Sequence, residues 1–367
     1  MTKYLAVFLS AGFAIVIVAG AFNYLTNPFG LFNSPLDLKK TQAYSRGRIL
    51  KAHQPLEQKL DALLVGNSRV ELGLSPSHPA LKALSTYNIG LPGADISMQS
   101  HYAFNVIKNQ TIKDLVMSVD FVDFLFTDGT PYRHPPSTYT VRLKNILDIG
   151  PNDQYMWHKI KDKSAALFSL DALTSSFTTI LSQNSQLSYM QKDGKMHEGE
   201  FFRVVENEGI NILFKQKRQN LRAKFEKSDW LVVNPETRSS LHFKNFKSFI
   251  SEAIKKKINL SLFISPLHES YIEILRETDK LDLFNEWKIL LVQHLQEINF
   301  FQSGQLWDFS VASEFTSEAL PKQDKKGIYM SWYWEPAHYR SALGDKILDT
   351  LLLAKNPWGK QLTPPSR

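Results

Sequence analysis

Hydrophobic and polar positions divide the chain into one long apolar segment and a remainder in which short apolar runs alternate with amphipathic stretches. From Tyr4 to Leu25 no residue is charged, and most are Ala, Val, Ile, Leu or Phe. A helix of that length spans about 30 Å of hydrocarbon, so the pattern predicts a transmembrane anchor within residues 1–26. A signal peptide cleaved near Ala19-Gly20-Ala21 is the alternative, but apolar residues continue past that point and favour a retained anchor.

Beyond residue 58, short apolar runs predict buried strands, and amphipathic stretches predict the helices between them. Strands that alternate with helices form βαβ units, which build a mainly parallel sheet. We therefore expect an α/β fold with a mainly parallel sheet. The expected strands lie at residues 60–65, around 87–90, and at 115–121, 260–264 and 305–309, and the clearest helices lie at 97–108 and 243–257.

The same pattern suggests how the chain is organised after the anchor. Residues 27–58 form a polar linker, and residues 59–356 form the α/β domain. Within that domain, residues 126–230 depart from the alternation of strands and helices, with a helix expected at 165–181 and an irregular polar stretch after it. We interpret them as an insertion that forms a lid or a substrate-binding cap. Residues 357–367 contain three prolines and are expected to be disordered.

Composition indicates a globular protein and argues against nucleic acid as a partner. Of the 367 residues, 43% are hydrophobic and 22% are charged, values that are typical of a folded domain. The net charge of +7 is spread along the chain, and the basic run Lys255-Lys256-Lys257 closes an amphipathic stretch, as a solvated helix end does. We therefore expect no nucleic-acid partner. No metal-ligand spacing and no phosphate-binding glycine loop occur, and the absence of cysteine is compatible with an oxidising compartment.

The first candidate for chemistry is Ser68, which follows a predicted strand in the sequence Gly66-Asn67-Ser68-Arg69. A serine on a turn from strand to helix exposes its hydroxyl at the helix N-terminus, where free N–H groups can stabilise an oxyanion. Gly66 permits the tight turn that such an arrangement needs. The alternative is that Ser68 is an ordinary N-cap residue.

The second candidate is the pair Glu335 and His338, in the sequence Trp334-Glu335-Pro336-Ala337-His338-Tyr339. A serine hydroxyl becomes a good nucleophile when a histidine takes its proton and a carboxylate orients that histidine. The roughly 270 residues between Ser68 and His338 are no objection, because the order of triad residues along the chain varies between folds. A histidine that is merely exposed on a loop is the alternative for His338.

Other polar residues follow predicted strands, where the active loops of a parallel sheet lie. The Gly90–Gly93 turn follows the second strand, Asp120 ends the third, and His268 comes shortly after the fourth. His268 could bind substrate or act as a rival base, whereas Asp308 is expected to cap a loop. The aromatic residues 332–334 either stack on sugar rings or belong to the core.

Three sequence blocks resemble the SGNH/GDSL hydrolase superfamily, and in particular the membrane-anchored SGNH-like proteins associated with bacterial cell-envelope polysaccharides. The resemblance implies a flavodoxin-like, three-layer α/β fold and acyl-ester chemistry through a covalent acyl-serine. It implies the catalytic roles of nucleophile for Ser68, base for His338 and orienting carboxylate for Glu335, which replaces the aspartate of the superfamily. The blocks are Leu64-Val65-Gly66-Asn67-Ser68-Arg69, Tyr87-Asn88-Ile89-Gly90-Leu91-Pro92-Gly93 and Glu335-Pro336-Ala337-His338.

The chain departs from this pattern at two positions. Asn67 stands where the superfamily usually has aspartate, and Asp120 lies where it has an asparagine that contributes to the oxyanion hole. An ionised aspartate would repel an oxyanion, so the donors are expected to be the N–H of Ser68 and an N–H of the following glycine turn. Asp120 is expected either to pair with Arg69 or to bind a sugar hydroxyl. The residues expected to bind the oxyanion or the substrate are Gly90, Gly93, Asn88, Arg69, Asp120 and His268.

These observations and the resemblance together predict a membrane-anchored, extracytoplasmic serine esterase or O-acyltransferase. The expected acyl group is acetyl, and the expected substrate is a polysaccharide or acylated glycan of the cell envelope or an exopolysaccharide. The resemblance places the chain in a bacterial inner membrane with a single span and a periplasmic domain, without a cofactor. A membrane protein that donates the acyl group is a further expected partner. The alternative is a non-catalytic scaffold in a polysaccharide export or modification system, because fold alone does not determine function.

Overall fold

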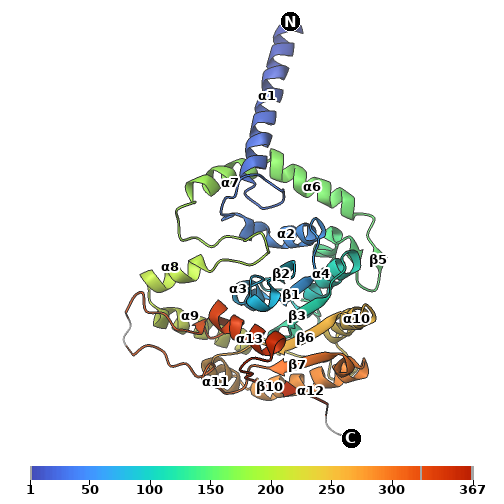
Figure 1. Ribbon diagram of the computed structural model, residues 1–367, viewed down its shortest axis with the longest axis vertical. Coiled ribbons are helices and arrows are strands. Elements are labelled where there is room, and N and C mark those ends of the chain that lie inside the picture. The colour runs from blue at the N-terminus through green and yellow to red at the C-terminus, as the bar shows by residue number, and fades with distance from the viewer. Residues whose placement is uncertain (1, 323–324, 365–367) are drawn as a thin grey trace.

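The computed structural model describes residues 2–322 and 325–364 (Figure 1). Helix α1, Thr2–Thr26, stands out from the rest of the protein, and its side chains are exposed over most of its length. By length and composition α1 could cross a membrane. The predicted apolar N-terminal helix is therefore present.

A six-stranded sheet forms the centre of the domain, with the order β10-β7-β6-β3-β1-β2. All neighbouring strands are parallel except β10, which runs antiparallel to β7. This arrangement confirms the predicted α/β fold with a mainly parallel sheet, and the five parallel strands match the five predicted ones. Their bounds are Ala62–Gly66 for β1, Thr86–Gly90 for β2, Asp114–Ser118 for β3, Asn259–Ile264 for β6, Gly304–Asp308 for β7 and Lys360–Leu362 for β10.

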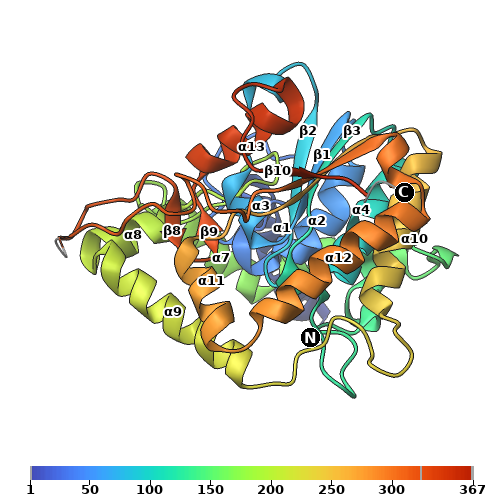
Figure 2. The same ribbon diagram turned by 90° about the horizontal axis from the view of Figure 1, so that it is seen from below.

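Helices cover both faces of the sheet (Figure 2). Because side chains alternate along a strand, Leu63 and Val65 of β1 enter one apolar core, whereas Ala62 and Leu64 enter the other. The first core contains side chains of α4 (Ile96–Asn109), α10 (Leu241–Lys255) and α12 (Leu281–Glu297). The second contains side chains of α3 (Ser68–Gly73), α9 (Ile210–Glu226) and α13 (Ser341–Leu353).

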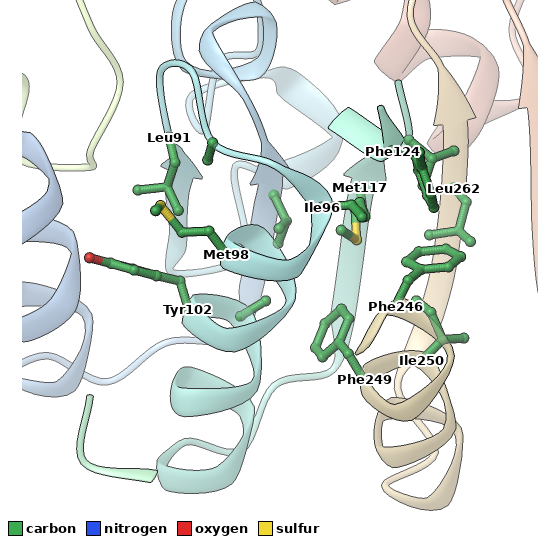
Figure 3. Packing of buried hydrophobic residues seen from close by; sticks show 14 of the residues in the cluster. Leu91, Ile96, Met98, Tyr102, Met117, Phe124, Phe246, Phe249, Ile250 and Leu262 are labelled. Atoms are coloured by element: carbon green, nitrogen blue, oxygen red, sulfur yellow. The ribbon is translucent and has the colours of Figure 1, made fainter. Parts of the chain in front are cut away.

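The first core is densely aromatic where α4 and α10 pack on the strands (Figure 3). Phe246 and Phe249 of α10 are fully buried beside Met117 of β3 and Leu262 of β6. Burial of an aromatic or aliphatic side chain of this size contributes roughly 1.5–3 kcal/mol each. The sheet and these helices therefore form a rigid support for the loops at the strand ends.

Shorter elements complete the fold around the sheet. Two two-stranded sheets are formed by β4 with β5 and by β8 with β9. The strands are β4 (Asn145–Ile146), β5 (Gly150–Pro151), β8 (Tyr333–Glu335) and β9 (His338–Tyr339), and the helices are α2 (Gly47–His53), α5 (Phe121–Phe124), α6 (Tyr155–Phe168), α7 (Leu170–Leu181), α8 (Gly199–Asn207) and α11 (Glu269–Glu277).

Three segments differ from the sequence-based picture. The helix expected at 165–181 is two helices, because Ser169 leaves the helical conformation and its hydroxyl accepts a hydrogen bond from the N–H of Ala172 at the start of α7. The segment assigned to a linker packs onto the domain, with Leu50 in an apolar cluster and Lys51 and His53 fully buried.

The third difference is at the C-terminus. Disorder was predicted for residues 357–367, but Lys360–Leu362 form β10, and Trp358 packs against Phe309 with 4.6 Å between ring centroids. Pairing with the edge strand β7 supplies backbone hydrogen bonds that the proline content did not reveal. Residues 365–367 lie outside the described residues.

Candidate functional site

The C-terminal ends of three neighbouring strands bring the predicted site together. Gly66 of β1 is in register with Gly90 of β2, and Val65 is in register with Met117 of β3. The residues that follow these strands therefore meet at one edge of the sheet, as parallel pairing requires. Ser68, the turn after Gly90 and Asp120 all lie in this region of the chain.

Ser68 occupies the first position of α3, and its neighbours fix it there. Asn67 is the N-cap, with extended backbone, and its side-chain oxygen accepts a hydrogen bond from the N–H of Arg69 at 2.8 Å. The alternative that Ser68 itself is the cap is therefore wrong. Ser68 is partly exposed, whereas its neighbours Asn67 and Arg69 are buried.

Ser68, His338 and Glu335 form one connected chain of hydrogen bonds. The hydroxyl oxygen of Ser68 lies 2.7 Å from Nε2 of His338. On the other side of the ring, Nδ1 of His338 contacts a carboxylate oxygen of Glu335. With Nδ1 protonated and bound to Glu335, Nε2 is left free to accept the proton of Ser68.

The carboxylate of Glu335 is buried, and it is held in its ionised form. Burial alone would raise the pKa of Glu335, but His338 and the N–H of Ala337 outweigh burial and hold the pKa below its ordinary value. The Ala337 N–H donates to the second carboxylate oxygen at 3.1 Å. Glu335 ends β8 and His338 begins β9, so a tight hairpin sets their separation.

Arg69 connects the loop of His338 to the end of β3. Its Nε donates to the carbonyl oxygen of Ala337 at 2.6 Å, and its guanidinium lies 3.0 Å from a carboxylate oxygen of Asp120. Burial opposes the charge of Arg69, but Asp120 outweighs burial and raises the pKa of the guanidinium above its ordinary value. The expected ion pair between Asp120 and Arg69 is therefore present. Asp120 also accepts hydrogen bonds from the N–H and hydroxyl of Ser265.

A second buried carboxylate, Asp123, joins this cluster. The side-chain nitrogen of Asn67 donates to Asp120 at 2.8 Å and to Asp123 at 2.7 Å, and Gln99 also donates to Asp123 at 2.8 Å. Burial, reinforced by the nearby charge of Asp120, raises the pKa of Asp123 to about 7. Neither Asp123 nor Gln99 was predicted from the sequence as a site residue. The spacing of Asp123 three residues after Asp120 was visible, but nothing marked Gln99, because its contact depends on how α4 packs.

Two of the expected oxyanion donors are already occupied. The side-chain nitrogen of Asn88 donates to two backbone carbonyl oxygens, that of Val70 within α3 and that of Leu74, which follows the helix. The Gly90 N–H donates to the side-chain oxygen of Asn88 at 2.7 Å. Asn88 and Gly90 therefore hold α3 against β2, and these donors are engaged within the protein and not directed at an oxyanion.

Gly90 also needs to be a glycine for a packing reason. A Cβ at this position would lie 2.3 Å from the backbone nitrogen of Glu71, so only glycine lets α3 approach β2 so closely. The carbonyl oxygen of Gly90 accepts a hydrogen bond from the buried ammonium of Lys51, which also pairs with Glu71 at 2.6 Å. Lys51 belongs to the segment predicted as a linker, and no role was predicted for it from the sequence.

Gly93 is the remaining expected donor in the second turn. Its backbone has φ of +68°, a conformation that glycine adopts without strain. Arg133 fixes the turn from outside, because its guanidinium donates to the carbonyl oxygens of Gly93 at 2.9 Å and Val122 at 2.6 Å. The N–H of Ser68, in the first turn of α3, is the other main-chain donor, since N–H groups there have no partner within the helix.

His268 has a structural role. The residue is buried, Nδ1 lies 2.8 Å from the hydroxyl of Ser270, and Nε2 lies 2.8 Å from the carbonyl oxygen of Glu318. Its backbone N–H donates to the carbonyl oxygen of Pro336, beside Glu335. With both ring nitrogens engaged, His268 supports the histidine hairpin and is not placed to act as a rival base.

The remaining candidates from the sequence are also structural. Asp308 caps a turn by accepting hydrogen bonds from the N–H and hydroxyl of Ser310. Tyr333 and Trp334 are buried in the second core, whereas Trp332 is partly exposed beside Phe315. Of these three aromatic residues, only Trp332 has a face available to a sugar.

The insertion at residues 126–230 contributes to the site through α8. Phe201 of α8 stacks on Trp334 with 5.5 Å between ring centroids, and it lies 6.1 Å from the ring of His338. The helices α6 and α7 of the same insertion lie elsewhere, at the base of α1 (Figure 1). Only part of the insertion therefore lies beside His338, and sequence pattern could not separate the two parts.

A hollow of about 700 Å³ lies away from Ser68, between the loop after α1 and the segment 189–193. Its lining includes Phe32, Lys40 and Tyr189, but neither Ser68 nor His338. We place the candidate site at the serine because Ser68, His338 and Glu335 form a connected chain of hydrogen bonds there. Among the residues that the structure describes, no group of three or more His, Asp or Glu side chains could hold a metal ion.

Comparison with known proteins adds no relative to this description. No protein-family model matches the chain, and no curated protein gives a significant match. The function is therefore inferred from the geometry around Ser68.

Proposed function

We propose that this chain is a membrane-anchored serine esterase or O-acyltransferase that works through an acyl-serine at Ser68. One observation carries the proposal: Ser68, His338 and Glu335 are linked in the order that serine hydrolysis requires. An exposed serine that merely caps a helix has no reason to lie 2.7 Å from a histidine that is itself bound to a buried carboxylate.

The geometry supports a two-step reaction. The Ser68 hydroxyl attacks the ester carbonyl carbon while its proton moves to Nε2 of His338, and the alcohol then leaves with that proton. In the second step a water or a sugar hydroxyl gives its proton to His338 and attacks the acyl carbon. The bond to Ser68 then breaks, His338 returns the proton to the Ser68 oxygen, and the acid or the acylated sugar is released. Glu335 keeps His338 oriented and stabilises the imidazolium that forms in each step. The N–H groups of Ser68 and Gly93 are the proposed oxyanion donors.

Hydrolysis and acyl transfer differ only in what attacks the acyl-serine. The ring of Phe201 of α8 lies beside that of His338, with 6.1 Å between centroids and a tilt of 44°, and would reduce the access of water to the acyl group from that side. This position favours a transferase whose acceptor is a hydroxyl-bearing polymer. The acceptor proposed from the sequence resemblance is a cell-envelope polysaccharide or exopolysaccharide, with acetyl as the acyl group and a membrane protein as its donor.

The strand order supports the proposed kinship with SGNH hydrolases. The strands β2-β1-β3-β6-β7 follow the order 2-1-3-4-5 of flavodoxin-like folds, with helices on both faces. From the sequence resemblance and the apolar helix α1 we also propose a bacterial inner-membrane location, with α1 as the single span and the domain in the periplasm.

A non-catalytic scaffold is the competing function, and it also has an observation in its favour. Asp120 occupies the position of the superfamily's oxyanion asparagine, and it is engaged with Arg69 and Asn67. An enzyme with one oxyanion donor fewer would be slower by about 10²–10³-fold. The scaffold would use the same surface to bind the polymer without reacting.

Labelling with a fluorophosphonate probe separates the two functions. The full chain in detergent would be treated with the probe and assayed for p-nitrophenyl acetate hydrolysis, beside Ser68→Ala, His338→Ala and the control Ser77→Ala, an exposed serine outside the site. We expect label and hydrolysis in the wild type and in Ser77→Ala, and neither in the other two. A folded wild type that takes no label at Ser68 and does not hydrolyse the ester would contradict the enzyme and favour the scaffold.

A further inference from the structure

Helix α7 presents its apolar side chains outward. Its most exposed apolar residues recur at intervals that place them on one face of the helix, and the exposed Asp171, which pairs with Arg46, lies at the border of that face. Leu170 is 80% exposed and Leu181 is 85% exposed, although leucine in a helix on a soluble domain usually faces the core. The outward face carries Leu170, Thr174, Phe177 and Leu181, and the inward positions are Ala172, Ser175, Ser176 and Thr179.

Helix α6 shows the same inversion. Trp157 and Ile160 are exposed, at 67% and 55%. Asp162 points inward instead, where its carboxylate lies 3.1 Å from Nε2 of His53 and accepts a hydrogen bond from Arg142. The outer face of α6 also carries the exposed Lys161 and Ser164. A face that combines tryptophan and isoleucine with a lysine is suited to the boundary between headgroups and acyl chains, where the lysine can reach the headgroups.

The base of α1 is fixed at the junction of these two helices. The side-chain nitrogen of Asn23 donates to the carbonyl oxygen of Leu167 at 2.8 Å, next to the end of α6. The hydroxyl of Ser176 on α7 donates to the side-chain oxygen of Asn23 and lies 2.6 Å from the hydroxyl of Thr26. These buried polar contacts hold α1 between α6 and α7, which flank its base (Figure 1).

The length of α1 places a bilayer at the level of these helices. Gly20 is where α1 first packs closely on the domain, because a Cβ there would lie 2.7 Å from the Phe168 ring. The part of α1 before Gly20, about 18 residues, is about 27 Å long. The hydrocarbon core is about 30 Å thick, so a bilayer that contains this part of α1 must reach down to α6 and α7.

We propose that α6 and α7 form an interfacial platform, defined by the exposed side chains of Trp157, Ile160, Phe168, Leu170, Phe177 and Leu181, that inserts into the leaflet through which α1 enters the membrane. Together the two helices are long and apolar enough for a span, but they bend by 59° at Ser169 and flank α1. They therefore lie in the boundary between headgroups and acyl chains, as amphipathic helices do.

The platform gives the domain a fixed orientation on the membrane. A single-pass anchor with a flexible linker would let the domain tumble, whereas α1, α6 and α7 are held together by buried contacts. Ser68 is then presented at a constant height and angle to the bilayer surface. The inference rests on α1 crossing the membrane and is independent of the chemistry proposed at Ser68.

Depth measurements with nitroxide labels test the platform directly. The chain has no cysteine, so single cysteines can be introduced and labelled without a background. The full chain would be reconstituted in phospholipid liposomes as Leu170→Cys, Leu181→Cys, Val16→Cys and Ile289→Cys, and the access of oxygen and a nickel chelate would be compared by EPR. Ile289 is a matched control, because it is 59% exposed on α12, which lies at the end of the domain opposite α1 (Figure 1).

We expect the label at position 16 deep in the bilayer, the labels at 170 and 181 about 5–10 Å below the headgroups, and the label at 289 in water. If position 16 is deep but positions 170 and 181 resemble 289, the platform is wrong and another protein must cover these helices. If position 16 is in water, α1 is no anchor and the platform fails with it. Neither result would bear on the reactivity of Ser68, which the probe experiment measures separately.

Discussion

The side-chain nitrogen of Asn67 lies 2.7 Å from a carboxylate oxygen of Asp123, and the same nitrogen donates to Asp120. Two buried carboxylates thus share one amide, directly before the candidate nucleophile. An aspartate at position 67, the residue that SGNH hydrolases usually have, would place three carboxylates in this small space. An asparagine at position 67 is therefore explained by Asp120 and Asp123, which follow β3 and both accept a hydrogen bond from its amide.

We expect Asn67→Asp to destabilise the protein by about 2–4 kcal/mol, because it replaces two hydrogen bonds to buried carboxylates with repulsion between like charges. Urea unfolding followed by circular dichroism would measure the loss. The double variant Asn67→Asp with Asp123→Asn exchanges donor and acceptor and should recover much of it. Equal stability of the single variant and the wild type would show that these contacts contribute little.

The raised pKa of Asp123 predicts a specific dependence of stability on pH. Its pKa is about 7 in the folded protein, against an ordinary value of 3.8, so the folded state binds this proton more tightly. The stabilisation is complete below about pH 4 and is lost as the pH rises through about 7, at about 1.4 kcal/mol for each unit of pKa difference.

Asp123→Asn removes this titration, so the difference in unfolding free energy between the variant and the wild type should change between pH 4 and 7. Urea unfolding at several pH values would measure this difference. The variant Asp128→Asn, which changes an exposed aspartate, serves as the control. If the unfolding free energies of Asp123→Asn and the wild type change with pH in parallel, the pKa of Asp123 is not raised in the folded protein.

Glu335→Gln should reduce kcat for ester hydrolysis by about 10⁴-fold with a small effect on KM, since the amide cannot stabilise the imidazolium or hold the same tautomer of His338. Steady-state kinetics on p-nitrophenyl acetate would test this. Glu335→Asp keeps the charge and should retain more activity than Glu335→Gln. Full activity in Glu335→Gln would remove Glu335 from the relay and leave a serine–histidine pair.

Lys51→Met should destabilise the protein by about 3–5 kcal/mol, because it leaves Glu71 buried without its partner. The loss should be smaller at pH 5 than at pH 8, since burial raises the pKa of Glu71 and a protonated carboxyl needs no cation. Urea unfolding at both pH values would measure the difference. The double variant Lys51→Met with Glu71→Met should be more stable than the single variant at pH 8; an equal loss in both would mean that packing, not the unpaired charge, causes it.

The hydrophobic pattern of the sequence was sufficient to predict elements whose conformation depends mainly on their own residues. Apolar runs located β1, β3 and β6, and the absence of charge from Tyr4 to Leu25 located α1. Pattern failed where a distant partner decides the conformation. Lys360–Leu362 form a strand because the edge of β7 is free to pair with them, and nothing in the C-terminal sequence records that edge.

The sequence by itself determined the type of fold, the apolar helix and the identity of Ser68, Glu335 and His338 as candidates, because strand–helix alternation and a few rare motifs are local properties. Tertiary structure decided what each remaining candidate does. Asn88, Gly90 and His268 are engaged in holding neighbouring elements, and Asp120 is neutralised by Arg69. The physical reason is that a polar side chain becomes available or occupied according to which donors and acceptors the fold places within about 3 Å of it, and those partners come from distant parts of the chain.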